Sequence, residues 1–389
     1  MHIPAQIQRW IEIDLDALAA NCLEVRRHLA ENVRLMAVVK ANGYGMGAVA
    51  CARVFEQYAD MLAVTTVEEG IELRLAGIKA PVLVLAPASA EEIPSYVQFS
   101  LIPGIDDAEA LQTLNDIQND IYPIHIEIDT GMNRTGVNSD AALALLQKAA
   151  ELPHIRTEGV FSHLAAAAAA NKVSARAQQK CFEDFLAAAR AKGLDYGAAH
   201  LANSAATLTM QDARYDMVRV GTLLYGQSPC ALPADWKLAD PWSVRAKVLA
   251  VHDVEAGETV GYGNDFKAKN AMRTAVVGIG YVDGLTMEPH ARSVSFSSAC
   301  REFANSIARL LLKKPKYYAL YKGKKLAIIG RVSMQLTVLD ISGTDISEGT
   351  VIEIPMRRMS ANAKLARAYK QNGEICEIHS QAQSSPAAE

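Results

Sequence analysis

The sequence predicts an α/β protein in two domains, a (β/α)8 TIM-like barrel over residues 1–235 and a β-rich domain over residues 236–389. The first observation is a repeated pattern from about residue 20 to residue 235. In it a short apolar run is followed by a loop with Gly or Asp and then by a helix-like stretch. The second is a change after about residue 236 to strand-like segments separated by turn residues. The third is length, because 389 residues at roughly 150 per domain suit two or three domains.

Eight apolar runs are the expected barrel strands. Short continuous apolar runs that alternate with helices are typical of a parallel sheet covered on both faces. Residues 67–77 and 174–193 are helix-like, and the second segment ends in a glycine that suits a helix C-terminus. A doubly wound open sheet is the alternative, but it usually has fewer strands, and KANGYGMG at 40–47 lacks the G-x-G-x-x-G spacing. In chain order the runs are LMAVVK (35–40), MLAVTT (61–66), PVLVLAP (81–87), FSLIPG (99–104), IHIEID (124–129), TEGVFSH (157–163), AAHLAN (198–203) and DMVRVG (216–221).

The C-terminal domain is expected to be all-β with an insertion. The first strand, near residues 10–14, is a candidate to pack with this domain. The insertion spans about residues 285–324, with helical spacing at 299–314, and residues 379–389 are expected to fray. The β-rich segments are residues 242–263, 274–284, 325–342 and 349–354.

Composition and charge exclude several classes of function. Lys and Arg number 39 against 43 Asp and Glu, so the net charge is −4 and neither a nucleic-acid partner nor a membrane-binding face is expected. No apolar run approaches the roughly 20 residues of a membrane span. The six cysteines are scattered without a C-x-x-C pair, as in a reducing compartment. We therefore expect a cytoplasmic protein without a metal site, although a removed export signal would leave no trace here.

Candidate active-site residues follow the expected strands, since barrel enzymes carry their chemistry at the C-terminal strand ends. A lysine that closes an apolar run is costly when charged, which lowers its pKa and makes it a good Schiff-base former. The alternative is a lysine whose amine reaches out to solvent at a strand end. Glycine at the end of the last run could let backbone N–H groups grip a phosphate. The residues at these ends are Lys40, Arg134, His163, Asn203, Ser204, Arg219 and Gly221.

Several segments resemble, in order, the signatures of the alanine racemase family. The resemblance covers about residues 9–345 and extends weakly to 376. It implies a pyridoxal-phosphate barrel, a C-terminal β domain and a homodimer that shares active sites for a small amino-acid substrate. The segments are WIEIDLDALAANC (10–22), AVVKANGYGMGA (37–48), HIEIDTGMNRTGV (125–137), HLANSAATL (200–208), RVGTLLYGQSP (219–229), VGYGNDF (260–266), GIGYVDG (278–284) and GRVSMQLTVLD (330–340).

The resemblance also implies a role for each matching residue. Lys40 would carry pyridoxal 5'-phosphate and act as one catalytic base, and Tyr262 from the other subunit would be the base on the opposite face. Arg219 and His163 would lie against the cofactor ring, and His200 would support Arg219. The phosphate would be held by Tyr44, Ser204, Gly221 and Thr222, with Asn203 beside them. Arg134 and Met334 would meet the substrate carboxylate and the cofactor's phenolic oxygen.

Taken without the resemblance, several of these residues have ordinary structural interpretations. Tyr262 could be a strand tyrosine with its hydroxyl in solvent. His163 after an apolar run is more often a satisfied core histidine, and Met334 alone would be assigned to a core. Arg219 could equally pair with Asp212 or Asp216.

The sequence departs from the family at four places. Glu127 stands where many members have a carbamylated lysine, and we expect its carboxylate to replace the carbamate and pair with Arg134. Leu285 replaces a tyrosine that narrows substrate entry, and Gln335 replaces an aspartate. The usual C-terminal phosphate-binding tyrosine is not recognisable, and Tyr369 is a poor candidate on spacing.

These features predict an isomerase, an amino-acid racemase that interconverts L- and D-alanine by a two-base mechanism. The changes at Leu285 and Gln335 leave open a different or broader specificity for serine, lysine or arginine. An amino-acid decarboxylase on the same barrel is another alternative, but such enzymes lack a tyrosine matching Tyr262. A pyridoxal-phosphate-binding homologue without turnover is the remaining alternative.

Overall fold

The computed structural model describes residues 2–287, 300, 303 and 317–380. The chain divides into two compact units, which are treated separately below. The barrel unit is Leu15–Pro241, and the β unit is Met1–Asp14 together with Trp242–Glu389. For comparison, the sequence places this division near residue 235. In the described part of the chain, no helix has the length and apolar character that crossing a membrane requires.

The barrel unit is built on eight parallel strands, which confirms the predicted fold class. They are hydrogen-bonded in the order β8-β7-β6-β5-β4-β3-β2-β9. Between β8 and β9 the ring is closed by single backbone bonds, from Asp216 N to Ala199 O at 3.1 Å and from Arg219 N to Ala202 O at 2.9 Å. The strands are β2 (Arg34–Val38), β3 (Met61–Val64), β4 (Val82–Pro87), β5 (Ile102–Ile105), β6 (Tyr122–Glu127), β7 (Ile155–Phe161), β8 (Ala198–His200) and β9 (Met217–Val220).

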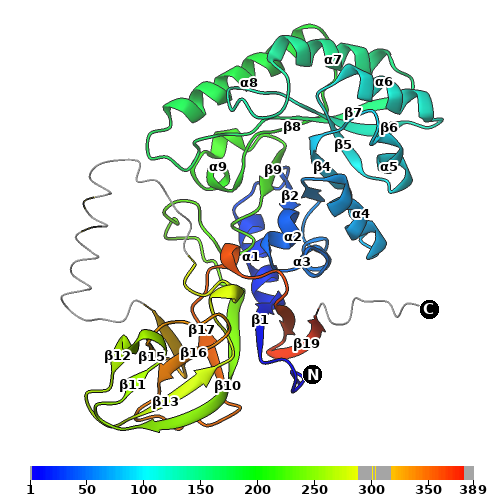
Figure 1. Ribbon diagram of the computed structural model, residues 1–389. Coiled ribbons are helices and arrows are strands. Elements are labelled where there is room, and N and C mark those ends of the chain that lie inside the picture. The colour runs from blue at the N-terminus through cyan, green and yellow to red at the C-terminus, as the bar shows by residue number, and fades with distance from the viewer. Residues whose placement is uncertain (1, 288–299, 301–302, 304–316, 381–389) are drawn as a thin grey trace, which may run out of the picture. The chain divides into compact units, whose positions relative to one another are not determined.

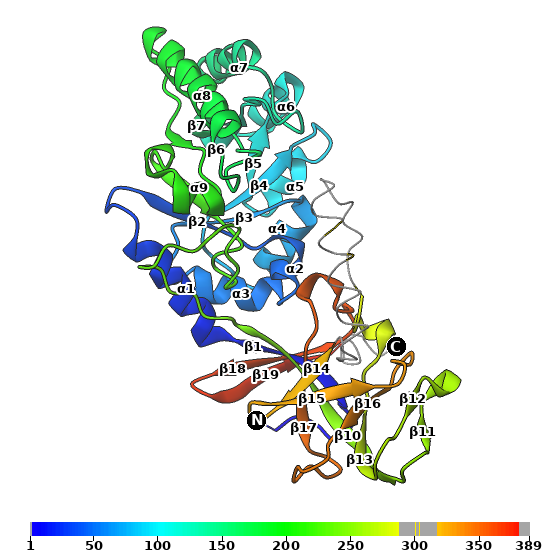
Figure 2. The ribbon, with the colours of Figure 1, turned by 90° about the vertical axis from the view of Figure 1, so that its left-hand side faces the viewer.

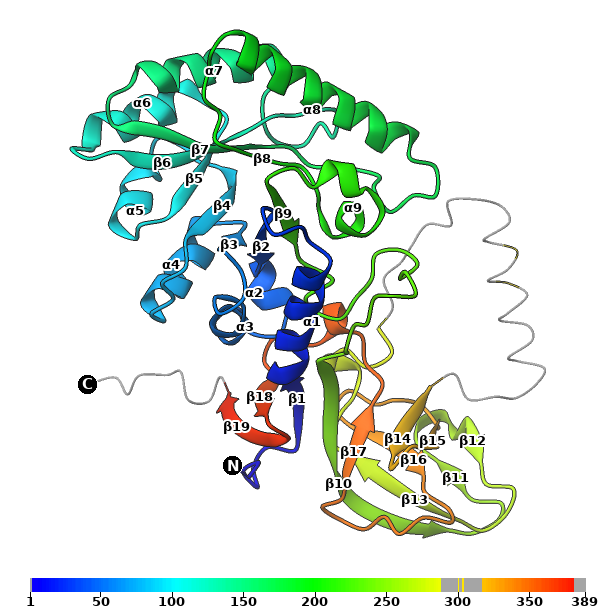
Figure 3. The same cartoon turned by 180° about the vertical axis from the view of Figure 1, so that it is seen from behind.

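Helices follow the strands and cover the outside of the sheet. Figures 1 and 3 show α7 and α8 along the outer side of β6 to β8, and α7 contacts β6, β7 and α8. Helix caps mark several boundaries, such as the capping box of Thr66 and Glu69 at the start of α4. The helices are α1 (Leu15–Arg27), α2 (Lys40–Tyr44), α3 (Ala48–Phe55), α4 (Val67–Leu75), α5 (Ile93–Gln98), α6 (Ala108–Ile117), α7 (Ser139–Glu151), α8 (Val173–Ala191), α9 (Ser204–Thr209) and η1 (Gln211–Ala213).

The barrel changes from apolar to polar along its strands. One buried cluster is entirely apolar and draws side chains from β2, β3, β4, β5, β8 and β9. Towards the C-terminal ends of β6, β8 and β9, by contrast, His125, Glu127, His200 and Arg219 are all buried. Burying polar groups is costly unless they are hydrogen-bonded, so this end of the barrel is where a functional site is expected.

The β unit is a nine-stranded sheet ordered β13-β16-β15-β14-β17-β10-β1-β18-β19, with a further pairing of β10 to β13 that closes six of these strands into a ring. The long strand β10 makes this possible, because its pairing shifts at a bulge between Val248 and Ala250. Figure 2 shows β18 and β19 beside β1, which pairs with both β10 and β18. The elements are β1 (Arg9–Asp14), β10 (Trp242–Val254), β11 (Thr259–Val260), η2 (Tyr262–Asn264), β12 (Phe266–Lys267), β13 (Met272–Val277), η3 (Tyr281–Asp283), β14 (Tyr318–Tyr321), β15 (Lys324–Ile329), β16 (Thr337–Asp340), β17 (Val351–Ile354), η4 (Arg358–Ser360), β18 (Ala366–Gln371) and β19 (Glu374–His379).

The predicted insertion at 285–324 extends too far at its C-terminal end. Residues Tyr318–Tyr321 form β14 and pair with β15 and β17, so they belong to the sheet. The predicted helical stretch at 299–314 falls outside the described residues except for Cys300 and Phe303, and the predicted frayed end lies outside them from residue 381.

Candidate active site

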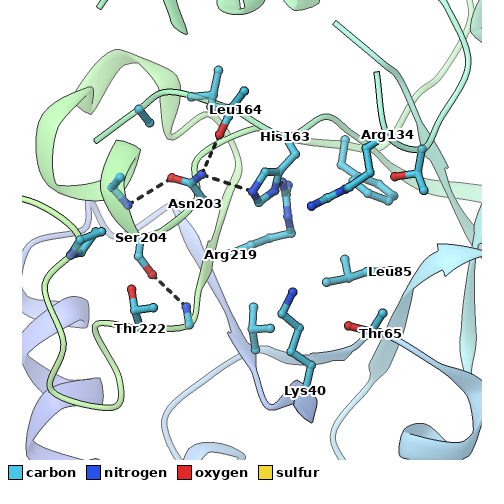
Figure 4. A pocket seen from close by; sticks show the side chains of 18 of the residues that line it. Lys40, Thr65, Leu85, Arg134, His163, Leu164, Asn203, Ser204, Arg219 and Thr222 are labelled. Carbon is cyan, nitrogen blue, oxygen red and sulfur yellow. Dashed lines mark hydrogen bonds between the residues drawn. The ribbon is translucent and has the colours of Figure 1, made fainter. Parts of the chain in front are cut away.

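A cavity of about 520 Å³ opens at the C-terminal ends of the barrel strands, and every residue that lines it belongs to the barrel unit. Figure 4 shows the Lys40 amine pointing into this space beneath Arg219, with Ser204 and Thr222 on one side and Thr65 and Leu85 on the other. The cavity brings together all but one of the barrel residues predicted for the site. Those that line it are Lys40, Tyr44, Glu127, Arg134, His163, Asn203, Ser204, Arg219, Gly221 and Thr222.

Lys40 follows the end of β2 after one residue, Val39, and is half-buried. Burial lowers the pKa of its amine, the positive charge of Arg134 lowers it further, and the negative charge of Glu69 opposes both. A lysine with a lowered pKa keeps more of its amine neutral near pH 7, which is the form that attacks a carbonyl. The position and the electrostatics of Lys40 therefore suit a nucleophilic amine.

The segment after Lys40 is a left-handed turn. Ala41, Asn42, Gly43 and Tyr44 have φ values of 52°, 52°, 60° and 53°, so α2 is not a right-handed helix. This conformation costs about 1–2 kcal/mol for each residue other than glycine, with asparagine the best tolerated of the others. The turn carries the phenol of Tyr44 towards the end of β9, where a Cβ on Gly221 would lie 2.1 Å from the Tyr44 hydroxyl. Only glycine at 221 leaves room for that phenol.

One end of the cavity is rich in groups that suit a phosphate. The Gly221 N–H donates to the Ser204 hydroxyl at 3.0 Å, and Thr222 Oγ1 is buried without a partner among the described residues. Burial raises the pKa of Tyr44 to about 12, so its phenol is a hydrogen-bond donor at neutral pH. Asn203 has a structural role here, because its side chain accepts from Ala205 N and Ala206 N at the start of α9.

Arg219 is held in a buried chain of donors and acceptors. It donates to Nδ1 of His200 at 2.9 Å and to the carbonyls of His200 and Ser162. Since arginine can only donate, Nδ1 of His200 is unprotonated and its Nε2–H donates to Nδ1 of His125 at 2.7 Å. The ion pairs with Asp212 or Asp216 that the sequence left open are not seen in this part of the structure. Asp212 pairs with Arg176 instead.

The two histidines behind Arg219 are neutral. Burial first, and then nearby arginines, lower the pKa of His125 to about 3 and hold the pKa of His200 well below its usual range. The family resemblance implied that His200 supports Arg219, whereas His125 was not predicted. The available signal was the alternation of the run IHIEID, because residues two apart on a strand face the same side. His125 therefore shares a face with Glu127.

His163 follows β7 and lines the cavity at the edge of the Arg219 chain. Asn203 Nδ2 approaches its Nε2 at 3.4 Å, and Arg219 approaches its Nδ1 at 3.5 Å. Burial, reinforced by the charges of Arg219, Arg134 and Lys40, lowers the pKa of His163 to about 3. The ring is therefore a neutral surface beside the cations rather than an acid.

The ion pair predicted between Glu127 and Arg134 does not form among the described residues. Glu127 is only 5% exposed and accepts a hydrogen bond from Thr135 at 3.0 Å, while its Oε2 is buried without a partner there. Burial raises the pKa of Glu127, although Arg219 and Arg134 act in the opposite direction. Arg134 is exposed on its loop, so the two side chains influence each other through the field rather than through contact.

The predicted residues of the β unit lie on neighbouring loops. Tyr262 is 71% exposed and Met334 is 56% exposed. The segment 280–284 bonds to the Met334 loop through Tyr281 N to Ser333 O and Val282 N to Met334 O, both at 3.1 Å. Arg331, just before Met334, pairs with Asp265, just after Tyr262. Three of the signature segments are thus joined in this unit.

Two other sequence expectations concern buried side chains of the β unit. Leu285 is fully buried, so its side chain is not at the surface of the chain. Tyr369 lies in β18 and is 1% exposed, and this burial agrees with its exclusion as a phosphate ligand.

Comparison with known proteins identifies the family. The sequence matches the alanine racemase N-terminal domain over residues 13–229 and the alanine racemase C-terminal domain over residues 242–382. The chain belongs to the alanine racemase family. It is 38% identical over 354 residues to an alanine racemase of Nostoc sp., covering 89% of this chain and 86% of that one. An alanine racemase of Synechocystis sp. is 37% identical over 342 residues, with 86% of each chain covered.

Solved alanine racemases have the same fold over nearly the whole chain. The enzyme of Clostridium difficile superposes with a TM-score of 0.82 at 26% identity, covering 97% of this chain and 99% of that one. The enzyme of Bacillus anthracis, solved with bound L-Ala-P, superposes with a TM-score of 0.79 at 25% identity, covering 98% and 100%. Alanine racemases use pyridoxal phosphate, so the cavity can be tested for that cofactor.

The residues present fit pyridoxal phosphate. The unpartnered Thr222 hydroxyl, the Ser204 hydroxyl, whose oxygen accepts the Gly221 N–H, and the protonated Tyr44 phenol form a cradle of donors at one end of the cavity. Lys40, with its lowered pKa, lies within reach of the same space (Figure 4). The cations Arg134 and Arg219 and the neutral His163 line it as well, which suits an anionic guest.

Proposed function

We propose that this protein is a pyridoxal-phosphate-dependent alanine racemase. The observation that carries the proposal is Lys40, a half-buried amine with a lowered pKa that points into a cavity whose opposite end offers phosphate donors. Lys40 would bind the cofactor covalently, with Tyr44, Ser204, Gly221 and Thr222 at its phosphate. When bound, the cofactor supplies an electron sink for the charge left when an amino acid loses its α-proton.

Racemisation requires one proton acceptor on each face of the amino acid, because a proton removed from one face is returned on the other. Lys40 is one such group, since its lowered pKa leaves a neutral amine to take a proton near neutral pH. The second would be Tyr262, whose side chain is 71% exposed and can be offered to a partner. Arg134, which lines the cavity, and the Met334 backbone would meet the substrate carboxylate and the cofactor's phenolic oxygen, as the family resemblance implies.

Arg219 would favour simple return of the α-proton over side reactions. Its guanidinium has only donors, and although burial lowers its pKa to about 10, it stays protonated at neutral pH. The carbonyls of Ser162 and His200 and the Nδ1 of His200 hold it in place. A fixed arginine donates a hydrogen bond without releasing a proton, so it limits how far charge is withdrawn from the substrate carbon. That restraint favours return of the α-proton over other outcomes.

We further propose that the active unit is a homodimer. Tyr262 lies among exposed apolar side chains on the three joined loops of the β unit, and these include Tyr281, Met334 and Leu336. An exposed apolar group of this kind, next to a tyrosine with chemistry to perform, suits burial against a second copy of the chain. Each copy would then give Tyr262 to the cavity of the other. Sedimentation of the purified chain tests the dimer.

A cytoplasmic location is also proposed. None of the six cysteines, all of which lie among the described residues, forms a disulfide, and two are fully buried, which agrees with a reducing compartment. Fractionation of the source cells with a marker for each compartment tests this proposal.

The deciding experiment combines spectroscopy with isotope exchange. The purified chain should show a visible absorption band that borohydride abolishes, and peptide mapping should find the reduced cofactor on Lys40. In deuterated solvent, alanine should exchange its α-hydrogen and racemise. Serine, lysine and arginine in parallel test whether Leu285 and Gln335 broaden specificity. Cofactor on Lys40 with no exchange of any amino acid would refute the racemase and leave a cofactor-binding protein.

A further inference from the structure

The carboxylate of Glu69 joins two loops at the rim of the cavity. Its Oε1 accepts the Ala41 N–H at 2.6 Å, directly after Lys40. Its Oε2 accepts the N–H groups of Thr65 at 2.8 Å and Thr66 at 3.3 Å, at the start of α4. One side chain therefore ties the end of β2 to the end of β3.

The loop on the β2 side needs such a tie. Ala41, Asn42 and Tyr44 all have positive φ, which residues other than glycine rarely adopt. Within the segment the turn is closed by Gly43 N to Val39 O at 2.9 Å and Gly45 N to Ala41 O at 3.0 Å. A conformation of this kind persists only when surrounding contacts determine it. The bond from Glu69 reaches the turn from α4, while α3 reaches it through the Ala48 N–H, which donates to Asn42 Oδ1 at 2.9 Å.

The tie is itself held firmly. Glu69 is the third residue of α4 and forms the capping box with Thr66, whose hydroxyl accepts the Glu69 N–H at 3.4 Å. The carboxylate therefore has little freedom, and its free oxygen is directed to Ala41. Thr65, which it also holds, lines the cavity beside Lys40 (Figure 4).

We propose that Glu69 is a positioning residue that holds the left-handed turn so that Lys40 and Tyr44 both reach the cavity. This inference rests on the proposed function, since it concerns the amine and the phenol that would receive the cofactor. Besides the capping bond, Glu69 places a negative charge near Lys40. The charged and titratable groups that act on Lys40 are Arg134 and His163, besides Glu69 itself. Burial keeps His163 neutral above its pKa of about 3, so Glu69 and Arg134 are the opposing charges.

Glu69→Gln tests the proposal because an amide has one acceptor oxygen. If that oxygen accepts the Ala41 N–H, the NH2 group of the amide faces the N–H donors of Thr65 and Thr66. In the reverse orientation the NH2 group faces the N–H of Ala41, so one set of donors always loses its acceptor. Glu69→Asp keeps the charge but shortens the reach by one methylene. Glu68→Gln is the matched control, since Glu68 is exposed in the same helical turn and loses the same charge.

The measurement is covalent capture of pyridoxal phosphate by the full chain after removal of any bound cofactor. Samples are trapped with borohydride at intervals, and the product at Lys40 is quantified by peptide mapping from pH 6 to pH 10. The rate at the high-pH plateau reports position, and the midpoint reports the pKa of Lys40. E69Q should lower the plateau about tenfold, as expected for losing a charge-assisted hydrogen bond. It should also lower the midpoint, because the negative charge of Glu69 favours the charged amine.

The variants separate reach from charge. E69D should lower the plateau but keep the midpoint near that of the unaltered chain, and E68Q should change neither. If E69Q matches E68Q in both plateau and midpoint, or loses only thermal stability, Glu69 is a helix cap and the proposal is overturned. Should E69Q fail to fold, an unchanged plateau in E69D overturns it equally.

A second readout keeps this proposal distinct from the function proposed above. Reductive methylation with ¹³C-formaldehyde labels the lysines, and the Lys40 resonance is assigned by its absence in Lys40→Arg. If the unaltered chain captures no pyridoxal phosphate at Lys40, the proposed function fails. The NMR titration of Lys40 in E69Q and E68Q still decides whether Glu69 sets the environment of the amine. A lower pKa of Lys40 in E69Q alone supports the proposal, and an unchanged pKa in both variants contradicts it.

Discussion

Gly159 on β7 leaves space for the His125 ring inside the barrel, and Gly159→Ala tests how much that space contributes to the free energy of unfolding. A Cβ at 159 would lie 2.6 Å from both Cε1 and Nδ1 of His125 and 2.9 Å from the Ala198 carbonyl. Real Cβ atoms essentially never approach other heavy atoms within 3.0 Å, so the ring and the strand must both move. Because Nδ1 of His125 accepts the hydrogen bond from His200, the movement breaks that bond.

The expected loss of stability follows from two contributions. Overpacking a buried site costs about 1–3 kcal/mol, and losing a neutral hydrogen bond adds about 0.5–1.5 kcal/mol. We therefore expect the free energy of unfolding of G159A to fall by about 2–4 kcal/mol. At about 2–4 °C per kcal/mol for a unit of this size, Tm should fall by roughly 5–15 °C.

The assay is thermal unfolding followed by circular dichroism, with Gly70→Ala as the control. A Cβ at Gly70 meets only the methyl end of Leu101, at 2.8 Å, and alanine is the better helix former there. Adding His125→Ala to G159A should restore part of the lost stability, because the coupling between touching residues is about 0.5–3 kcal/mol. If the Tm of G159A lies within about 1 °C of the Tm of G70A, a difference of less than about 0.5 kcal/mol, the close packing described for His125 is wrong.

Three further changes test the site itself. Tyr262→Phe should abolish racemisation but leave the visible cofactor band intact, and retained turnover would remove Tyr262 as a base. Thr222→Val should leave the cofactor-free chain as stable or more so by about 1 kcal/mol, since it removes a buried unpartnered hydroxyl. The same change should weaken cofactor binding about tenfold in an absorbance titration, and unchanged affinity would exclude Thr222 from the phosphate site. A raised folded pKa at Glu127 means that its contribution to stability is complete at low pH and is lost as pH rises through that pKa. Glu127→Gln should therefore raise the Tm of the cofactor-free chain at pH 7 and flatten the dependence of this Tm on pH, and a lowered Tm would contradict the burial argument. The same change should slow racemisation, because Arg134 loses a nearby negative charge.

The barrel strands could be predicted from sequence because each is a short apolar run buried on both faces. The run ending at Gly221 contains β9, the run ending at Lys40 overlaps β2, and each of the eight predicted runs overlaps a strand. The β unit was harder to delimit, since strand pairing there depends on residues distant in the chain. The local sequence of Tyr318–Tyr321 does not predict that this segment pairs with β15 and β17, so β14 was assigned to an insertion.

The site residues also divide into those that local sequence predicts and those that only the folded chain brings together. Lys40 and Arg219 were predicted from the apolar runs, because a charged residue that closes such a run or stands within it is unusual on local grounds. The run IHIEID gave no local reason to pair His125 with His200, which is distant in sequence and meets it only when the barrel closes. Glu69 was not among the residues predicted for the site, and the capping box that it forms with Thr66 explains the residue fully without Ala41. Its second role exists only in three dimensions.

The local rules of protein structure are broken in this barrel mainly where the cavity lies. The turn after Lys40 is left-handed, and Thr222 Oγ1 and Glu127 Oε2, which line the cavity, are buried without partners among the described residues. Each of these features costs free energy, and none contributes to the apolar core below. A fold under selection for stability alone would lose them, as stabilising substitutions at such positions are easily found. The cost is offset only if something that enters the cavity bonds to these groups, and an anionic cofactor with an amino acid beside it would do so at Thr222 and around Arg134. The strained turn and the unpartnered Thr222 hydroxyl therefore suit a cavity that binds an anionic group, and this argument does not depend on sequence similarity.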